Sequence, residues 1–153
     1  MKKNLTKQSG FTLIELVIVI IVLGILAATA APKFIDLQSD ARISSLNGVK
    51  AALEGGATLT YSRAALDGVE KVSAATVTIK GETVNTVFGY PAATQAALED
   101  VIDLSQNDWV YGTSGALVTI AASGATATDC LVTYAAAANE NTRPAIAVIE
   151  TGC

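Results

Sequence analysis

The sequence predicts an α+β fold in which one long N-terminal helix packs on a small antiparallel β-sheet. Residues 11–31 form an apolar run with one charge, and residues 32–65 continue with apolar side chains every three or four positions. Both patterns are typical of a helix. Residues 66–153 alternate short apolar segments with turn residues, which is typical of strands. We therefore expect a helix followed by a globular head that contains a hairpin, a short helix and an antiparallel sheet.

The apolar run at residues 11–31 has the length of a membrane span. As a helix it would measure about 30 Å, which matches the hydrocarbon layer of a bilayer. Lys2, Lys3 and Lys7 precede the run without any acidic residue. Because positive charge favours the cytoplasmic side of a membrane, we expect the N-terminus in the cytoplasm and the rest of the chain to be exported.

Glu15 is the exception within this run, because no other charged residue lies between Lys7 and Lys33. A charged side chain in the hydrocarbon layer costs at least about 2.5 kcal/mol on insertion scales. A residue that is retained at this cost is expected to have a function.

A secretory signal peptide is the alternative interpretation of the N-terminus. Ala28-Thr29-Ala30 before Ala31 matches a small-residue cleavage site. Three features argue against it: the run is long for a signal peptide, Glu15 lies where such peptides avoid charge, and the helical pattern continues past the cut.

Residues 32–65 are expected to continue the helix with one apolar face. The positions in this stripe are Phe34, Leu37, Ala41, Leu46, Val49, Leu53, Ala57, Tyr61 and Ala64. Charged residues lie between them, as in a helix that packs on a domain. Pro32 lacks an amide for an interior hydrogen bond, and Gly24 costs about 1 kcal/mol relative to alanine. The segment between them is expected to be the weak part of a kinked but continuous helix.

The remaining residues are expected to form strands and one short helix. Residues 76–80 and 83–87 alternate their side chains around Gly81-Glu82, as in a β-hairpin. A helix is expected over residues 92–103, after Pro91. The segments expected to form an antiparallel sheet are 109–111, 116–121, 130–135 and 145–149.

Composition and charge argue against several classes of function. The formal net charge is -4, and the basic residues are scattered among acids rather than clustered as in nucleic-acid-binding proteins, so no nucleic acid is expected as a partner. The chain has no histidine, which removes histidine-based dyads and zinc motifs. Glu99, Asp100 and Asp103 are interpreted as a solvated helix face rather than an acid pair or a cation site. We expect no enzyme activity, no cofactor and no metal.

The string GFTLIELVIVIIVLGILAATAAPKF closely resembles the N-terminus of type IV prepilins, and APKFIDLQSDAR and FGYP resemble pilins of the mannose-sensitive haemagglutinin type. The resemblance implies the type IV pilin fold. It implies a leader, residues 1–10, that is removed by cleavage after Gly10, and N-methylation of Phe11 as the first mature residue. Residues 11–31 would form the membrane-spanning and filament-core helix, with Glu15 at the family's acidic position. The stretch between Gly24 and Pro32 would unwind on assembly.

The resemblance also implies a location and a set of partners. The prepilin would be a single-pass protein of the bacterial inner membrane and would later become part of an extracellular surface filament. Its partners would be a prepilin peptidase/N-methyltransferase, an ATPase-driven assembly machinery, minor pilins and further copies of itself. The amine that cleavage creates at Phe11 is expected to pair with Glu15 of another copy and to set the axial register.

Cys130 and Cys153 are expected to form a disulfide, because the exported part of the chain lies in an oxidising compartment. The bond would close a loop of about 24 residues and contribute about 3 kcal/mol to stability. A reactive or metal-binding pair is the alternative, but it would have no histidine beside it. In similar pilins a C-terminal disulfide bounds a surface loop.

Three functions remain open from the sequence. The first is the major structural subunit of a type IV pilus that serves cell attachment or motility. The second is a type II secretion pseudopilin or a minor pilin, although similar pseudopilins usually lack a C-terminal disulfide. The third is a membrane-tethered or secreted binding module.

Overall fold

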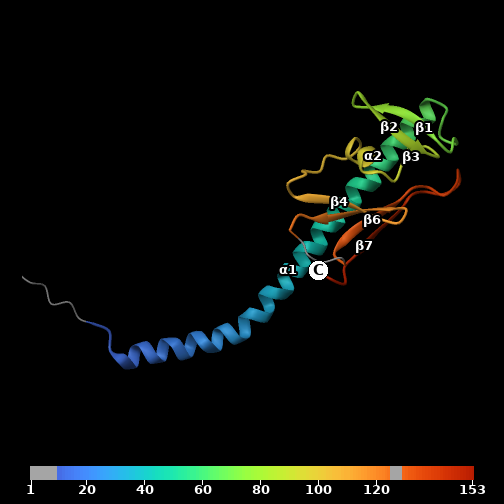
Figure 1. Cartoon of the computed structure of the whole chain (residues 1–153). Helices are drawn as coiled ribbons and strands as arrows, with labels where there is room; N and C mark the ends of the chain where they lie inside the picture. Colours follow the sequence, from blue (N-terminus) through green and yellow to red (C-terminus); the bar gives the residue numbers. More distant parts are fainter. Residues whose placement is uncertain (1–9, 125–128) are drawn as a thin grey trace, which may run out of the picture. The chain divides into compact units, whose positions relative to one another are not determined.

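The structure is a computed structural model that describes residues 10–124 and 129–153. Figure 1 shows one long helix followed by three strands, a short helix and four strands. These elements are α1 (Leu13–Leu66), β1 (Ala75–Ile79), β2 (Glu82–Val87), β3 (Tyr90–Pro91), α2 (Gln95–Glu99), β4 (Trp109–Ser114), β5 (Leu117–Ala122), β6 (Leu131–Ala135) and β7 (Ala145–Ile149). The predicted α+β class is confirmed. The chain divides into two compact units between Ser39 and Asp40.

The first unit contains the N-terminal part of α1, which includes both Gly24 and Pro32. The hydroxyl of Thr29 donates to the carbonyl oxygens of Ile25, at 3.3 Å, and Leu26, at 3.0 Å. Hydrogen bonds of this kind satisfy a polar side chain within an apolar helix. Thr29 therefore does not prevent this part of α1 from lying in lipid.

The second unit begins with the C-terminal part of α1, whose apolar face is largely buried. The buried members of the predicted stripe are Leu46, Val49, Leu53, Ala57 and Ala64. Phe34 and Leu37 belong to the first unit, and their side chains are 69% and 61% exposed. In the second unit the core residues of the sheets pack against α1 from Leu46 onward.

β1 and β2 form the predicted hairpin, with a turn one residue earlier than expected. Ile79 pairs with Glu82, so the two turn residues are Lys80 and Gly81. Their φ angles are 53° and 90°, as in a type I′ turn. Glycine adopts this conformation freely, whereas a residue with a Cβ is disfavoured in it by about 1 kcal/mol.

The predicted helix over residues 92–103 is shorter in the structure. Pro91 belongs to β3, where it pairs with Thr86 of β2. The helix begins only after Thr94, whose side chain caps it by accepting a hydrogen bond from the Ala97 amide. Before this cap, Pro91 belongs to β3, and residues 92–93 connect β3 to the helix.

Gly56 allows the turn that follows α2 to approach α1 closely. A Cβ at this position would lie 3.0 Å from Cγ2 of Ile102 and 3.3 Å from Cγ2 of Val101. Both isoleucine and valine are buried in the core. A larger residue at position 56 would therefore displace the turn.

The described strands form two antiparallel sheets, one that contains the predicted hairpin and one that contains the four segments expected to form a sheet. The first sheet has the order β1-β2-β3, and the second has the order β4-β5-β6-β7. In the second sheet alternate residues point into the core, namely Val118 and Ile120 of β5 and Val132 and Tyr134 of β6. This alternation is what a sheet with one buried face requires.

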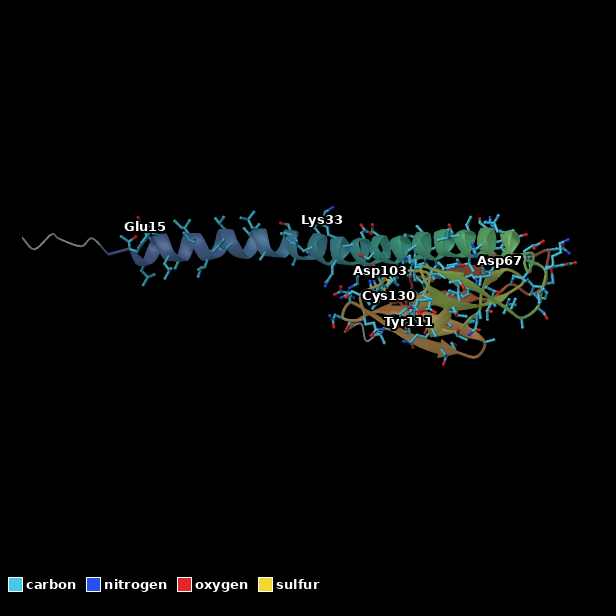
Figure 2. All side chains as sticks on the ribbon, turned by 90° about the horizontal axis from the view of Figure 1, so that it is seen from above. Glu15, Lys33, Asp67, Asp103, Tyr111 and Cys130 are labelled. Atoms are coloured by element: carbon cyan, nitrogen blue, oxygen red, sulfur yellow. A yellow bond between two sulfur atoms is a disulfide. The ribbon has the colours of Figure 1, made fainter. Side chains whose placement is uncertain are left out.

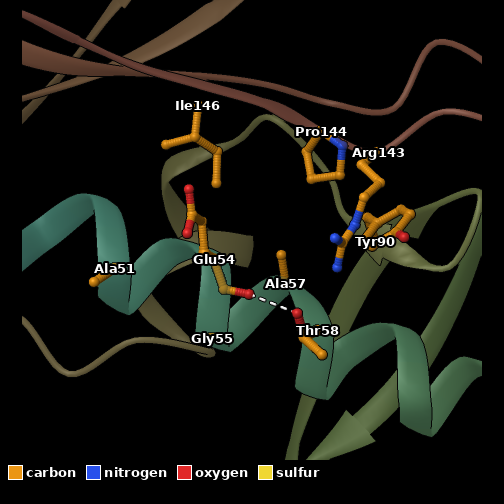
Figure 3. Close-up of a pocket in the computed structure, with 9 residues that line it drawn as sticks. All are labelled: Ala51, Glu54, Gly55, Ala57, Thr58, Tyr90, Arg143, Pro144 and Ile146. Atoms are coloured by element: carbon orange, nitrogen blue, oxygen red, sulfur yellow. Dashed lines mark hydrogen bonds between the residues drawn. The ribbon is translucent and has the colours of Figure 1, made fainter.

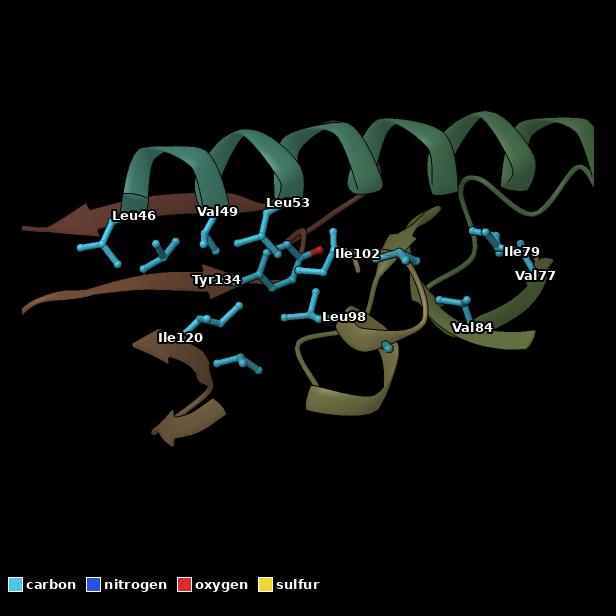
Figure 4. Packing of buried hydrophobic residues seen from close by; sticks show 14 of the residues in the cluster. Leu46, Val49, Leu53, Val77, Ile79, Val84, Leu98, Ile102, Ile120 and Tyr134 are labelled. Carbon is cyan, nitrogen blue, oxygen red and sulfur yellow. The ribbon is translucent and has the colours of Figure 1, made fainter. Parts of the chain in front are cut away.

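The core lies between α1 and the strands, with α2 at its side (Figure 4). Tyr134 is fully buried, and its hydroxyl donates to the Pro91 carbonyl oxygen at 2.7 Å. This hydrogen bond joins β6 of one sheet to β3 of the other. Burial, with a smaller contribution from Tyr90, raises the pKa of Tyr134 above its ordinary value, so the phenol stays protonated and remains a donor.

Cys130 and Cys153 form the predicted disulfide, with their Cα atoms 4.9 Å apart. Neither sulfur is therefore free for metal binding or nucleophilic chemistry. Nη1 of Arg42 on α1 donates to the Cys153 carbonyl oxygen at 3.4 Å. The segment that the disulfide closes is thus also attached to α1.

Two buried threonines give a test of the packing. Oγ1 of Thr60 donates to the Gly56 carbonyl oxygen at 2.8 Å, whereas Oγ1 of Thr86 has no partner among the described residues. We expect Thr86→Val to raise the free energy of unfolding by about 1 kcal/mol, because valine keeps the shape and removes an unsatisfied hydroxyl. The measurement is denaturant unfolding of the full chain in detergent, followed by the fluorescence of its single tryptophan, Trp109.

Thr60→Val is the matched control for this prediction. It removes a hydroxyl that is hydrogen-bonded, so it should not stabilise the fold. If Thr86→Val destabilised the protein as much as Thr60→Val, the assignment of Thr86 as unsatisfied would be wrong.

Candidate functional site

Thr12 and Glu15 close the N-terminus of α1 with reciprocal hydrogen bonds, and Figure 2 shows Glu15 at this end of the helix. Oε2 of Glu15 accepts from the Thr12 amide at 2.8 Å and from the Thr12 hydroxyl at 2.7 Å. The Glu15 amide donates to Oγ1 of Thr12 at 3.3 Å. This arrangement is a capping box, in which a threonine at the N-cap and a glutamate three residues later satisfy free helix amides.

The capping box provides hydrogen-bond donors for only one of the two oxygens of the Glu15 carboxylate. Its Oε2 accepts two hydrogen bonds, whereas its Oε1 forms none with the described residues. The N-terminus of a helix also carries partial positive charge, which favours a carboxylate there. Glu15 is thus held in a defined position and keeps one oxygen available for a further donor.

The role of Thr12 was not anticipated from the sequence, although a signal for it is present. Threonine followed three residues later by glutamate, immediately before an apolar run, is the sequence pattern of a capping box. The same carboxylate therefore caps the helix locally in addition to any role in lipid.

The Gly10–Phe11 junction lies just before α1, in backbone that is neither helical nor buried. The Phe11 side chain is 94% exposed. A peptide bond must be accessible and extended to enter a peptidase site, and helical backbone would prevent this. Phe11 is four residues before Glu15, which corresponds to about one helical turn.

An apolar surface surrounds Glu15 on all sides of the helix. Every large hydrophobic side chain from Phe11 to Leu26 is exposed in the single chain. By length and composition α1 can cross a membrane. A helix that is apolar all round is suited to lipid or to the centre of a helix bundle.

Gly24 and Pro32 lie within α1, on the same stretch of helix. A Cβ at Gly24 would meet no atom within 4 Å, so packing within the chain does not require glycine there. The expected flexibility between these residues remains a prediction.

Glu99, the acidic residue of α2, forms hydrogen bonds with two glutamine side chains of the second unit. Oε1 of Glu99 accepts hydrogen bonds from Gln95 at 2.8 Å and from Gln106 at 3.1 Å. Burial, and secondarily the charge of Glu99, raises the pKa of Tyr111 to about 12. Within residues 10–124 and 129–153, no cluster of three or more potential metal ligands occurs.

Comparison with known proteins identifies the prokaryotic N-terminal methylation motif at residues 5–31. The chain is similar to the type IV narrow pilus major component PilA5 of Thermus thermophilus, with 47% identity over 47 residues, which cover 31% of this chain and 40% of that protein. It is also similar to the fimbrial protein EcpC of Eikenella corrodens, with 34% identity over 92 residues and 60% of each chain covered.

A third relative is the type IV major pilin protein PilE1 of Neisseria gonorrhoeae, which is 56% identical over 39 residues, or 26% of this chain and 24% of that protein. The similarity thus spans at most 60% of the length of any of these three relatives. No solved structure matches the chain.

Proposed function

We propose that this chain, a type IV pilin-like protein with the N-terminal methylation motif, is the major structural subunit of a type IV pilus. The observation that carries the proposal is the position of Glu15. Its carboxylate lies in the first turn of an exposed apolar helix, four residues after the Gly10–Phe11 junction, and one of its oxygens is unoccupied among the described residues. The N-terminal methylation motif at residues 5–31 covers this same region.

Cleavage after Gly10 would create an amine at Phe11, close to the carboxylate of Glu15. In a filament the amine of one copy can pair with the carboxylate of another. This pairing compensates the charge where lipid and protein exclude water, and it sets the axial register of the copies. Thr12 acts as a positioning residue in this scheme, because it holds Oε2 and leaves Oε1 free.

The apolar surface of α1 fits both stages of this scheme. In the membrane it contacts lipid, and in the filament it contacts the helices of other copies. A subunit can therefore leave the bilayer without exposing this surface to water. The stretch between Gly24 and Pro32 would supply the flexibility that assembly requires, because both residues weaken helical structure.

The proposal includes partners, an orientation and a subclass. The precursor, with leader residues 1–10 in the cytoplasm, is a substrate of a prepilin peptidase/N-methyltransferase in the inner membrane. An ATPase-driven machinery with minor pilins then assembles it at the cell surface. APKFIDLQSDAR and FGYP support the mannose-sensitive haemagglutinin-type subclass.

The mature N-terminus tests this proposal most directly. Mass spectrometry of filaments sheared from cells is expected to identify an N-methylated Phe11 as the first residue. The cleavage-blocking variant Gly10→Val is the control, and it should retain the leader and give no filaments. A mature chain that begins at Ala31 would indicate a secretory signal peptide and would overturn the proposal.

A pseudopilin or minor pilin is the second candidate function. It shares the N-terminal helix and its processing, so the amount of surface filament distinguishes the two. The Cys130–Cys153 disulfide supports the major pilin, since similar pseudopilins usually lack one. The alternative of a binding module explains the apolar helix but gives no role to the Gly10–Phe11 junction or to Glu15.

A further inference from the structure

A groove of about 710 Å³ in the second unit lies between α1 and the segment that leads into β7 (Figure 3). Small residues of α1 line one side, and a Cβ at Gly55 would meet no atom within 4 Å. Pro144 and Ile146 line the opposite side. The ring of Tyr90 also lines the groove, and it stacks on Tyr61 with the ring centroids 4.8 Å apart. The groove is therefore formed by packed, ordered elements.

Two opposite charges line this groove, Glu54 on α1 and Arg143 on the loop before β7. Among the described residues, neither side chain forms a hydrogen bond or an ion pair; the one ion pair found joins Arg63 to Asp67. The loop that carries Arg143 is held by Thr142, whose Oγ1 accepts from two backbone amides at 3.1 and 3.0 Å. The groove thus presents one negative and one positive charge without partners of their own.

The tip of the β1–β2 hairpin carries the complementary pair, Lys80 and Glu82, on either side of Gly81. Both side chains are exposed, and neither has an ion-pair partner among the described residues. Lys80 and Phe88 are the described non-glycine residues with positive φ. Phe88 packs on a buried cluster, which offsets its cost, whereas the exposed Lys80 has no such packing. The type I′ turn sets this conformation and places the Lys80 side chain at the exposed tip of the hairpin.

The hairpin tip is not part of the groove, and the loop between β6 and β7 contributes Arg143 and Pro144 to the groove (Figure 1). A surface and its complement at two different places on one chain produce a heterologous contact. Such a contact repeats from copy to copy and builds an open polymer when its rotation does not close a ring. This geometry favours a second copy of the chain as the occupant of the groove.

We propose that the β1–β2 tip of one copy docks in this groove of a neighbouring copy, with Lys80 facing Glu54 and Glu82 facing Arg143. The inference rests on the proposed function, since it requires that copies assemble in a filament. Opposite charges at such a contact fix the register and reject misaligned neighbours. The docking contact would join the second units of neighbouring copies, in addition to the pairing at Glu15.

Charge reversal within the full chain tests the docking contact. Lys80→Glu and Glu54→Lys each bring like charges together, and each should reduce the yield of sheared filaments by about tenfold. The double variant restores opposite charges, because every copy supplies both a tip and a groove, and its yield should return to within about twofold of the parent. Lys71→Glu is the matched control, since Lys71 is exposed but lies outside the tip and the groove, and it should leave the yield unchanged.

Four other results would overturn the docking contact. Normal filaments with each single reversal, or no recovery in the double variant, would remove this inference and leave the proposed function intact. A loss of yield that matches a loss of folding, measured as the unfolding transition of the detergent-extracted variant, would assign the effect to stability. If the parent chain forms no filaments, the proposed function fails together with the inference.

Discussion

Glu15→Ala is expected to abolish surface filaments, whereas the fold of the second unit should not change. In the proposed filament the alanine removes one partner of a charge pair that lipid and neighbouring helices would keep away from water. Loss of one partner from a buried pair typically costs about 3 to 5 kcal/mol, which corresponds to more than a hundredfold in an equilibrium constant. The measurement is electron microscopy of sheared filaments, together with the fraction of mature protein found in them. Normal filaments of this variant would contradict the proposed register contact.

Glu15→Gln is the matched variant that separates two roles of this side chain. A glutamine at this position can preserve the capping box with Thr12 and has nearly the same shape, but it carries no charge. If pairing with the Phe11 amine drives assembly, the glutamine variant should also fail to form filaments. If it assembles normally while the alanine variant does not, helix capping rather than charge pairing is the function of Glu15.

Loss of the Cys130–Cys153 disulfide is expected to lower the free energy of unfolding of the head by about 3 kcal/mol, because the bond closes a segment with a sequence separation of 23. The closed segment lowers the conformational entropy of the unfolded chain, and reduction of the disulfide restores that entropy. The double substitution Cys130→Ala with Cys153→Ala avoids leaving a lone thiol. Denaturant unfolding of the detergent-extracted protein gives the difference.

Treatment with a reductant gives the internal control for the disulfide. It should destabilise the parent by a similar amount and have no effect on the double variant. Equal stability of the oxidised and reduced parent would contradict the prediction.

Much of the candidate site could be predicted from the sequence, because its features are local. The Gly10–Phe11 junction, the apolar run and the lone Glu15 lie within a few helical turns, and their meaning depends on neighbours along the chain. The capping partner Thr12 was equally local and could have been found from its spacing to Glu15. Flexibility between Gly24 and Pro32, by contrast, depends on the contacts of a filament and stays a prediction.

Element boundaries were predicted less accurately, because they depend on competing contacts. The hairpin turn lies at Lys80-Gly81 because the register that buries Val77 and Ile79 opposes Ile79 to Glu82. The helix expected over residues 92–103 spans only Gln95–Glu99, and it begins late because Pro91 completes the sheet beside Thr86. In both cases strand pairing decided which residues remained for the turn and for the helix.

Composition and pattern were enough to predict the α+β class, the membrane-length helix with its single carboxylate and the identity of the disulfide partners, since the chain contains two cysteines. These features follow from composition and from periodic patterns that act over short distances along the chain. Packing in three dimensions was needed to show that the buried residues of α1 begin at Leu46, and that Glu54 and Arg143 line one groove. Such juxtapositions depend on how sheets and helix pack side chains together, and residues that are far apart in the chain meet only after the core has formed.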